Sequence, residues 1–156
     1  MFADLIKELT GLTAESVGIA TIERAIKARM AALGVSEDTR YLTVVRQSVA
    51  EKQQLINEIT VPETWFFRDL EPFRLLENYA TRVWLPNKGN ELFRVLSLPC
   101  STGEEPYSIV MTLLDAGLAP ENFAVDAVDI SSRVINVAKA GVYGRNSFRG
   151  DNLQVS

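Results

Sequence analysis

An apolar run that ends in a small-residue turn and an acidic pair constrains this chain more than any other feature. Residues 94–108 read Arg-Val-Leu-Ser-Leu-Pro-Cys-Ser-Thr-Gly-Glu-Glu-Pro-Tyr-Ser. The apolar residues Val95, Leu96 and Leu98 predict a short strand that is buried on both faces of a parallel sheet. Glu104 begins a predicted helix, because carboxylates are favoured in a first turn and an early proline costs no hydrogen bond there. The stretch therefore predicts strand, loop and helix, with a ligand pocket where the strand ends.

The loop between this strand and helix limits the ligand that can bind there. It holds a single glycine, Gly103, so the G-x-G-x-x-G fingerprint of dinucleotide-binding proteins is missing. Glu104 and Glu105 would repel a phosphate, and they favour a ligand with hydroxyl groups or a positive charge. A nicotinamide oxidoreductase is therefore disfavoured, whereas an adenosine ligand without a pyrophosphate fits the loop.

A second strand and helix follow. Residues 123–129, Phe-Ala-Val-Asp-Ala-Val-Asp, predict the strand, and Ser131 or Ser132 is expected to cap a helix that runs to Gly141. Strand, helix and strand in this order predict a right-handed βαβ unit with parallel pairing. Asp129 then lies at the carboxyl end of the second strand, where an acid commonly accepts hydrogen bonds from ribose hydroxyls. A helix cap is the alternative interpretation of Asp129.

The first 60 residues predict a small bundle of four short helices. Gly11 and Gly34 are expected to end the first two helices, because glycine readily adopts the left-handed conformation of a helix end. Thr21 and Ser36 are expected to cap the second and third helices, and residues 51–59 form the fourth.

Three basic residues follow one side of the second predicted helix, away from its apolar positions. Arg24, Lys27 and Arg29 predict a solvated helix face. A docking surface for an acidic protein partner is the alternative, and charge reversal in a binding experiment would separate the two.

An aromatic segment follows the bundle. Residues 61–69, Val-Pro-Glu-Thr-Trp-Phe-Phe-Arg-Asp, interrupt the helical pattern, since Pro62 disfavours helix at the residue before it. Three successive aromatic residues are too many for an exposed linker, which predicts a seam buried between two layers. Thr64 and Arg68 are the polar residues that this seam could direct at a ligand.

Composition excludes several classes of function. Sixteen basic and twenty acidic residues give a net charge of −4, which provides no general attraction to nucleic acid or to anionic membranes. The chain has neither a signal peptide nor an apolar run long enough for a membrane span, so we expect a cytoplasmic protein without membrane insertion. With no histidine and one cysteine, Ser-His-Asp and Cys-His arrangements and a metal cluster are excluded. Cys100 fits a small buried thiol better than a nucleophile.

Three segments together resemble the CheR-type chemotaxis methyltransferases, which transfer a methyl group from S-adenosylmethionine to glutamate side chains of chemoreceptors. The segments are Glu-Thr-Trp-Phe-Phe-Arg at 63–68, Cys-Ser-Thr-Gly-Glu-Glu-Pro-Tyr-Ser at 100–108, and Asp-Ile at 129–130 with Ala-Lys-Ala-Gly-Val-Tyr at 138–143. Their order and spacing match, and the resemblance covers nearly the whole chain. The sequence Tyr-Gly-Arg-Asn-Ser-Phe-Arg-Gly at 143–150 is most similar to the Wsp-type members, which serve surface-sensing pathways.

The resemblance implies an α/β fold in three parts. Residues 1–60 would form the helical domain, residues 61–90 the aromatic seam and a connecting helix, and residues 91–156 the first βαβα portion of a Rossmann-like methyltransferase domain. The sheet of this family has more strands than the two found here, so we expect the N-terminal part of a longer enzyme. Such a piece should bind the cofactor weakly and could self-associate through its uncovered strand edges.

The resemblance also implies which residues contact S-adenosylmethionine, namely Thr64, Arg68, Glu104 and Asp129. Arg68 would suit the methionyl carboxylate because a planar guanidinium matches it. Glu104 would suit the α-amino group and Asp129 the ribose. Some relatives carry an asparagine where Pro62 stands, so a contact there would have to use the backbone carbonyl.

The implied reaction explains why histidine is not needed, and it leaves the catalytic residue unknown. A glutamate carboxylate is ionised at neutral pH and can attack the sulfonium methyl group without a general base. The implied partner is the cytoplasmic helical region of a chemoreceptor-type protein. A non-catalytic receptor-docking or regulatory fragment of such an enzyme is the alternative.

Overall fold

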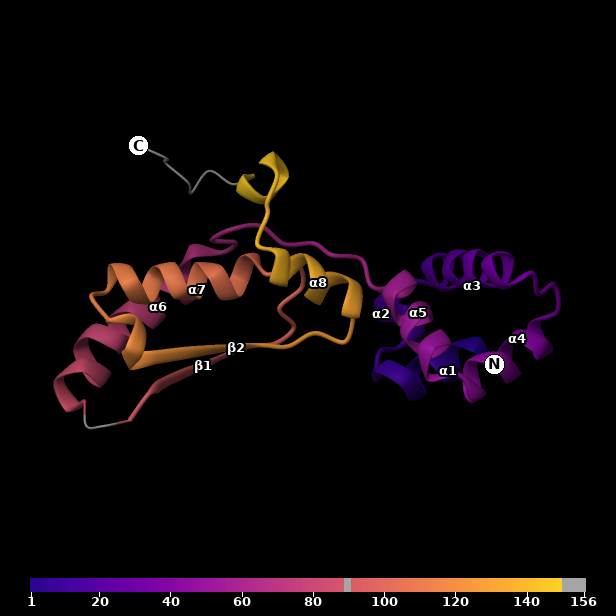
Figure 1. Cartoon of the computed structure of the whole chain (residues 1–156), viewed down its shortest axis with the longest axis horizontal. Coiled ribbons are helices and arrows are strands. Elements are labelled where there is room, and N and C mark those ends of the chain that lie inside the picture. Colours follow the sequence, from indigo (N-terminus) through magenta and orange to yellow (C-terminus); the bar gives the residue numbers. More distant parts are fainter. Residues whose placement is uncertain (89–90, 150–156) are drawn as a thin grey trace. The chain divides into compact units, whose positions relative to one another are not determined.

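The chain folds into two compact units in its computed structural model, which describes residues 1–88 and 91–149. One unit contains residues 1–61 and 130–132, and the other contains residues 62–129 and those from 133 onward (Figure 1). Residues 87–90, whose sequence Asn-Lys-Gly-Asn predicts a polar turn, lie partly outside the described residues, and residues 151–156 lie wholly outside them.

Residues 1–61, all of which are described, form five helices instead of the expected four. The additional helix is one short turn between the first two expected helices. It forms because the hydroxyl of Thr13 accepts a hydrogen bond from the backbone N–H of Ser16 and so caps the turn. The helices are α1 (Phe2–Thr10), α2 (Ala14–Val17), α3 (Ile19–Leu33), α4 (Asp38–Gln47) and α5 (Val49–Ile59).

The ends of these helices were easier to predict than their beginnings. Gly11 and Gly34 end α1 and α3 with φ angles of 74° and 64°, which confirms both expected stops. The two expected caps are wrong, because Thr21 lies inside α3 and α4 begins one residue later than a Ser36 cap requires. Neither α3 nor α4 has a side-chain cap, so packing of their apolar faces decides where they begin. That core consists of Leu5, Ile6, Ile22, Ala25, Ile26, Met30, Tyr41, Leu42, Val45, Leu55 and Ile59.

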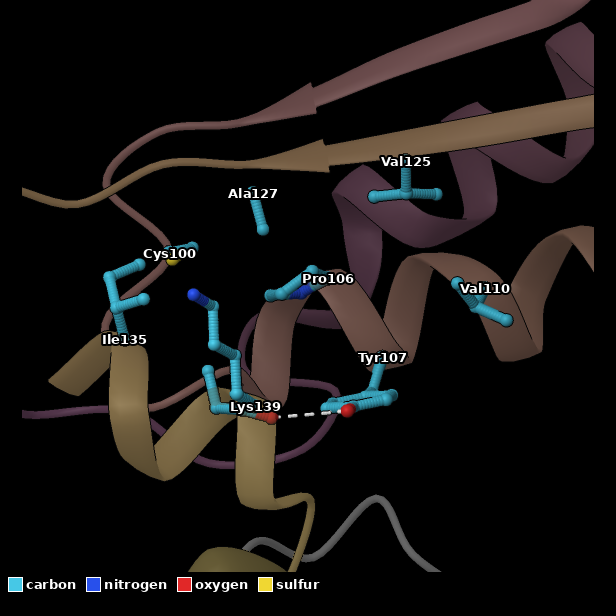
Figure 2. A pocket seen from close by; sticks show the side chains of 9 residues that line it. Cys100, Pro106, Tyr107, Val110, Val125, Ala127, Ile135 and Lys139 are labelled. Atoms are coloured by element: carbon cyan, nitrogen blue, oxygen red, sulfur yellow. Dashed lines mark hydrogen bonds between the residues drawn. The ribbon is translucent and has the colours of Figure 1, made fainter.

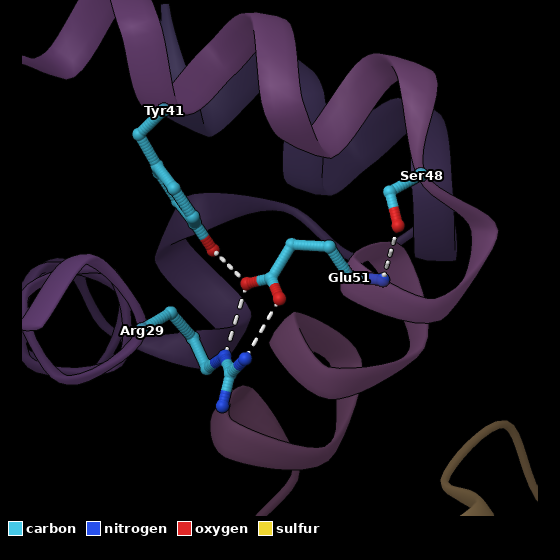
Figure 3. A network of polar contacts seen from close by, with 4 residues as sticks. All are labelled: Arg29, Tyr41, Ser48 and Glu51. Carbon is cyan, nitrogen blue, oxygen red and sulfur yellow. Dashed lines mark hydrogen bonds and ion pairs between the residues drawn. The ribbon is translucent and has the colours of Figure 1, made fainter. Parts of the chain in front are cut away.

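A buried ion pair crosses the helical unit (Figure 3). Arg29 donates to both carboxylate oxygens of Glu51, from Nε to Oε1 at 3.0 Å and from Nη2 to Oε2 at 2.7 Å. The hydroxyl of Tyr41 also donates to Oε1, at 2.9 Å, and the hydroxyl of Ser48 accepts from the backbone N–H of Glu51. Burial, followed by the hydrogen bond to Glu51, raises the pKa of Tyr41, so its hydroxyl remains a donor.

This pair corrects the expected solvated face of α3. Arg24 and Lys27 are exposed as expected. Arg29 is not part of that face, because its side chain is only 17% exposed and is committed to Glu51. The helical pattern predicted that Arg29 is exposed together with Arg24 and Lys27. In the structure, α5 packs beside α3 and its Glu51 covers the Arg29 side chain.

The second unit is built on a parallel βαβ arrangement, as expected. Strand β1 (Phe93–Ser97) pairs in parallel with β2 (Phe123–Ala127), in a register from Phe93↔Phe123 to Ser97↔Ala127. Helix α7 (Glu104–Asp115) connects the strands, α6 (Leu70–Tyr79) precedes them, and α8 (Ser132–Ala140) follows them. The helical fold class of the first part and the parallel fold class of the second are therefore confirmed. Short helical turns occur at Ala80–Trp84, Leu85–Asn87, Pro120–Asn122 and Arg145–Phe148.

One face of the two-stranded sheet carries the core of this unit. Phe93 and Val95 of β1 pack with buried residues of α7 and with partly buried residues of α6 on the same face (Figure 1). The expectation that the strand is buried on both faces is wrong, since Leu96 is 60% exposed and Leu98 is 61% exposed. The physical reason is that the crossover helix and the preceding helix pack together, so within the described residues no helix covers the opposite face.

The aromatic segment is packed, as expected, and Phe66 is the buried one of its three aromatic residues, whereas Trp65 and Phe67 are half-buried. Phe66 is 6% exposed and lies between Tyr143 and Phe148, with ring centroids at 4.9 and 5.0 Å. Phe67 contacts Phe73 of α6 at 5.4 Å. Across the described residues, none of the helices combines the length and the apolar character that crossing a membrane would require.

Candidate functional site

The loop from β1 to α7 is shaped by backbone contacts with the segment that follows β2. The N–H of Cys100 donates to the carbonyl of Val128 at 2.9 Å, so the two strand ends stay side by side. The N–H of Ser101 then donates to Oδ2 of Asp129 at 2.9 Å. The loop and Asp129 therefore meet at the carboxyl ends of both strands, where parallel sheets bind their ligands.

Gly103 allows this loop to approach α8 closely. Its φ is 101°, and an added Cβ would lie 2.8 Å from the Cβ of Ala138 and 2.5 Å from the hydroxyl of Tyr143. That hydroxyl donates to the carbonyl of Thr102 at 2.8 Å. Only glycine fits this position without displacing the helix, so the loop conformation depends on it.

Glu104 is the first residue of α7 and is almost fully buried, at 3% exposed. Thr102 donates its hydroxyl to Oε2 at 2.6 Å, and Ser147 donates its hydroxyl to Oε1 at 2.8 Å. Within residues 1–88 and 91–149, no lysine or arginine lies within ion-pairing distance of this carboxylate. A buried carboxylate is expensive without a cationic partner, so the site is suited to a ligand that brings a positive charge.

A buried hydroxyl lies in the loop that leads to Glu104. The hydroxyl of Ser101 is buried and forms no hydrogen bond with the described residues. Buried hydroxyls nearly always find a partner, so this one is free to contact a polar ligand. Together with Glu104 and Asp129, it fits a ligand that carries an amino group and hydroxyl groups, as S-adenosylmethionine does.

Thr64 and Arg68 lie in the turn before α6. Thr64 is half-buried, and the guanidinium of Arg68 lies 4.7 Å from the ring centroid of Trp65. Arg68 also donates from Nη1 to the carbonyl of Glu63 at 2.7 Å, while 45% of its side chain stays exposed. The guanidinium of Arg68 is thus held by Trp65 and the Glu63 carbonyl, with Oδ2 of Asp69 3.8 Å from its Nε, while the side chain as a whole remains accessible to a ligand.

The turn that carries Arg68 is anchored on the same part of α7 as Glu104. The N–H of Phe67 donates to the hydroxyl of Ser108, which in turn donates to the backbone carbonyl of Glu104. Phe67 and Asp69 have φ angles of 53° and 55°, in the left-handed region that costs such residues about 1 to 3 kcal/mol each. Strain of this kind on both sides of Arg68 is typical of a backbone that is held for function.

A separate pocket of about 330 Å³ lies between β2, α7 and α8 (Figure 2). Its lining is mainly apolar, and it includes none of the four expected site residues. Tyr107 closes one side by donating its hydroxyl to the carbonyl of Ala138 at 3.1 Å, and Lys139 extends into the space. The pocket offers no carboxylate for an amino group or ribose, so we place the candidate site at the strand ends instead.

Cys100 lines that pocket but is a poor nucleophile. The residue is fully buried, and burial, followed by the negative charge of Asp129, raises the pKa of its thiol. The thiol therefore stays protonated, which agrees with the expected structural role. No group of three or more metal-ligating side chains occurs among the residues that the structure describes.

Sequence reasoning did not identify Ser147 as a site residue, and it also missed the side-chain roles of Ser101 and Thr102. The segment around Ser147 supported only the resemblance to Wsp-type members, because it has neither helical nor strand periodicity. Its hydroxyl contacts Glu104, which lies 43 residues earlier in the chain. No local sequence pattern predicts a contact between residues so far apart, so it could be found only from the fold.

Fold and site together define the class of this protein. A parallel βαβ unit, with acidic side chains at the ends of both strands and no glycine-rich phosphate loop, fits part of a Rossmann-like domain that binds a nucleoside without a pyrophosphate. Two family models match the chain, "CheR methyltransferase, all-alpha domain" over residues 1–60 and "CheR methyltransferase, SAM binding domain" over residues 62–154. The chain belongs to the CheR methyltransferase family, and the cofactor of its second domain is S-adenosylmethionine.

Individual relatives support the same assignment. The chain is 53% identical over 97% of its length to the "Probable biofilm formation methyltransferase WspC" of Pseudomonas aeruginosa, and 49% identical over 97% to the protein of that name from Pseudomonas putida. It is 42% identical over 74% of its length to the "Chemotaxis protein methyltransferase" of Salmonella typhimurium. The expected resemblance to the family and to its Wsp-type members is confirmed. The chain spans 36% of each of the first two relatives and 39% of the third.

Proposed function

We propose that this chain provides the amino-acid-binding and ribose-binding edge of a protein-glutamate O-methyltransferase that uses S-adenosylmethionine. The observation that carries the proposal is the buried carboxylate of Glu104, which has hydroxyl donors but no cation among the described residues. The loop that leads to Glu104 also holds Ser101, whose N–H binds Asp129 and whose buried hydroxyl forms no hydrogen bond with the described residues.

Each of the four site residues has a task in this proposal. Glu104 binds the α-ammonium group of the cofactor, and Asp129 binds its ribose hydroxyls. The Arg68 guanidinium binds the methionyl carboxylate, and Thr64 contacts the cofactor from the same turn. The Ser101 hydroxyl adds a polar contact that the sequence did not predict.

The reaction in this proposal requires positioning more than proton transfer. The cofactor supplies a methyl group on a positively charged sulfur, and the acceptor glutamate is already ionised at neutral pH. Holding two reactants in line and away from water can lower a barrier by roughly 7 to 11 kcal/mol. The absence of histidine from the chain is compatible with such a reaction.

The acceptor in this proposal is a glutamate in the cytoplasmic helical region of a chemoreceptor-type protein. The names of the relatives support a signalling methyltransferase, with chemotaxis in one case and biofilm formation in the others. The exposed side chains of Leu96 and Leu98 support the further expectation that this chain alone binds the cofactor weakly. They also support self-association through the uncovered strand face and edges.

A methylation assay tests the proposal. Radiolabelled S-adenosylmethionine and receptor fragments are supplied to this chain and to a form extended to the length of its relatives. We expect label in receptor glutamates with the extended form, little with this chain, and a loss with Glu104→Gln. Glu105→Gln is the matched control, because Glu105 is an exposed acid one residue away. Full activity of the extended Glu104→Gln variant would contradict the proposed site, and label on another residue type would contradict the proposed acceptor.

A further inference from the structure

Ser147 contacts Glu104, the carboxylate that is buried without a cationic partner among the described residues of the second unit. It lies in the short helical turn Arg145–Phe148, after α8, and its hydroxyl donates to Oε1 of Glu104 at 2.8 Å. The other oxygen, Oε2, accepts from Thr102 at 2.6 Å. A carboxylate can accept about four hydrogen bonds, so each oxygen of Glu104 retains capacity for a ligand.

The backbone around Ser147 is itself fixed. Its carbonyl accepts from the N–H of Phe66 at 2.9 Å, and its N–H donates to the carbonyl of Gly144 at 3.0 Å. The neighbouring ring of Phe148 stacks on Phe66 at 5.0 Å. The backbone that carries the Ser147 hydroxyl is therefore held by two hydrogen bonds and by the packing of its neighbour Phe148.

The same segment also fixes the second hydroxyl that contacts Glu104. Tyr143 donates to the backbone carbonyl of Thr102, the residue whose side chain bonds Oε2. Burial, followed by the charge of Glu104, raises the pKa of Tyr143 to about 12, so Tyr143 keeps its proton at neutral pH. Residues 143–148 thus support both hydrogen bonds that orient the carboxylate.

The chemistry of these donors determines what they can do. Hydroxyl groups are neutral, so they orient the carboxylate without cancelling its charge. An arginine in the same place would occupy both oxygens and neutralise them, as Arg29 does to Glu51. Two neutral donors instead orient the carboxylate and leave both of its oxygens able to pair with a ligand cation.

We propose that Ser147 is a positioning residue that aims the carboxylate of Glu104 at the α-ammonium group of the cofactor. This inference rests on the proposed function, because it concerns the same site. It assigns to residues 143–148 the recognition of the amino-acid part of the ligand and not of its adenosine part.

Two ligands that differ only in the amino-acid part test the inference. S-adenosylhomocysteine carries the α-ammonium and carboxylate groups, whereas 5′-methylthioadenosine lacks them. Binding of both is measured by titration calorimetry on the form extended to the length of the relatives. We expect Ser147→Ala to weaken S-adenosylhomocysteine about tenfold and to leave 5′-methylthioadenosine unchanged, since a lost bond to a charged group is worth about one such factor.

Three further variants test whether a weaker binding of S-adenosylhomocysteine by Ser147→Ala comes from the lost hydroxyl contact with Glu104. Ser147→Thr keeps a hydroxyl and should restore most of the affinity. Ser97→Ala is the matched control, because it removes a comparable serine bond of 2.6 Å, to Glu105 instead of Glu104, and should not change the ratio of the two affinities. Glu104→Gln should weaken S-adenosylhomocysteine more than Ser147→Ala does, again with 5′-methylthioadenosine unchanged.

The outcomes separate the two proposals. Equal weakening of both ligands by Ser147→Ala would show a structural role and overturn the inference. Normal binding by Ser147→Ala with a defect in Glu104→Gln would also overturn it, while the proposed function stands. Normal binding by Glu104→Gln, or no binding of S-adenosylhomocysteine at all, would overturn the proposed site and the inference with it.

Discussion

Each unit of this protein buries one glutamate, and the two glutamates are partnered in opposite ways. Glu51 in the helical unit is 5% exposed, and Glu104 in the second unit is 3% exposed. The guanidinium of Arg29 forms a bidentate pair with the carboxylate of Glu51, and the hydroxyl of Tyr41 also donates to it. Among the described residues, Glu104 receives side-chain hydrogen bonds from the hydroxyls of Thr102 and Ser147 and from no cation.

The difference teaches how to distinguish a structural carboxylate from a ligand-binding one. Burial by itself would raise the pKa of Glu51, but the hydrogen bonds from Arg29 and Tyr41 outweigh it and lower that pKa. The charge of Glu51 is thus compensated inside the unit. Glu104 is buried to the same degree without such compensation, so its charge is available to a cation from outside.

The largest expected effect comes from removing Arg29, the cation that pairs with Glu51. Arg29→Ala should destabilise that unit by about 3 to 5 kcal/mol, because it leaves the buried charge of Glu51 unpaired. Urea unfolding followed by far-UV circular dichroism measures the change. Lys27→Ala, an exposed residue of the same helix, should change stability by less than about 0.5 kcal/mol. An equal loss of unfolding free energy in both variants would show that Arg29 does not compensate the buried charge of Glu51, and the contrast with Glu104 would then fail.

A somewhat smaller loss is expected where the second unit depends on its backbone. Gly103→Ala should cost about 2 to 4 kcal/mol, since an L side chain is strained at a φ of 101° and its Cβ would overlap Ala138. Tryptophan fluorescence during urea unfolding reports on this unit, because Trp65 and Trp84 both belong to it. Gly117→Ala is the control, as φ is also positive there but no atom lies within 4 Å of the added Cβ. A cost no greater than that of the control would show that α8 can move away.

The same substitution at both glutamates tests the comparison directly. Glu51→Gln should destabilise the protein by about 1.5 to 3 kcal/mol, because it weakens hydrogen bonds to a charged group. Glu104→Gln should destabilise the ligand-free protein less than Glu51→Gln does, because the weakened bonds from Thr102 and Ser147 are offset by the removal of a buried charge that has no cationic partner among the described residues. Urea unfolding without ligand measures both variants. A large loss in Glu104→Gln would mean that an internal partner compensates its charge after all.

The smallest effect is the pH dependence of the Glu51 contribution. The folded pKa of Glu51 lies below its ordinary value of 4.5, so the stability it adds is fully present above pH 4.5. That stability is lost as the pH falls through the folded pKa. The difference in unfolding free energy between the wild type and Glu51→Gln should therefore shrink below pH 4.5 and stay constant from there to neutral pH. A difference that is independent of pH would contradict the ion-pair assignment.

Local signals in the sequence determined most of the architecture. Glycines at helix ends, apolar periodicity and a single βαβ order were enough for the helical unit and the parallel strand pair, since these features depend on neighbouring residues. The motifs around Thr64, Arg68, Glu104 and Asp129 were also sufficient for the family, which the comparisons confirm. Their individual roles stay proposals.

Only the tertiary structure decided the partners of the charged residues. Arg29 looked solvated because its helix pattern cannot show that α5 brings Glu51 to it. Leu96 and Leu98 looked buried because an apolar run does not show which face of a sheet the helices cover. Ser147 could not be linked to Glu104 at all, as the contact forms only when the chain returns past α8 to the aromatic turn. Burial and charge compensation depend on residues far apart in the chain, so they require the fold.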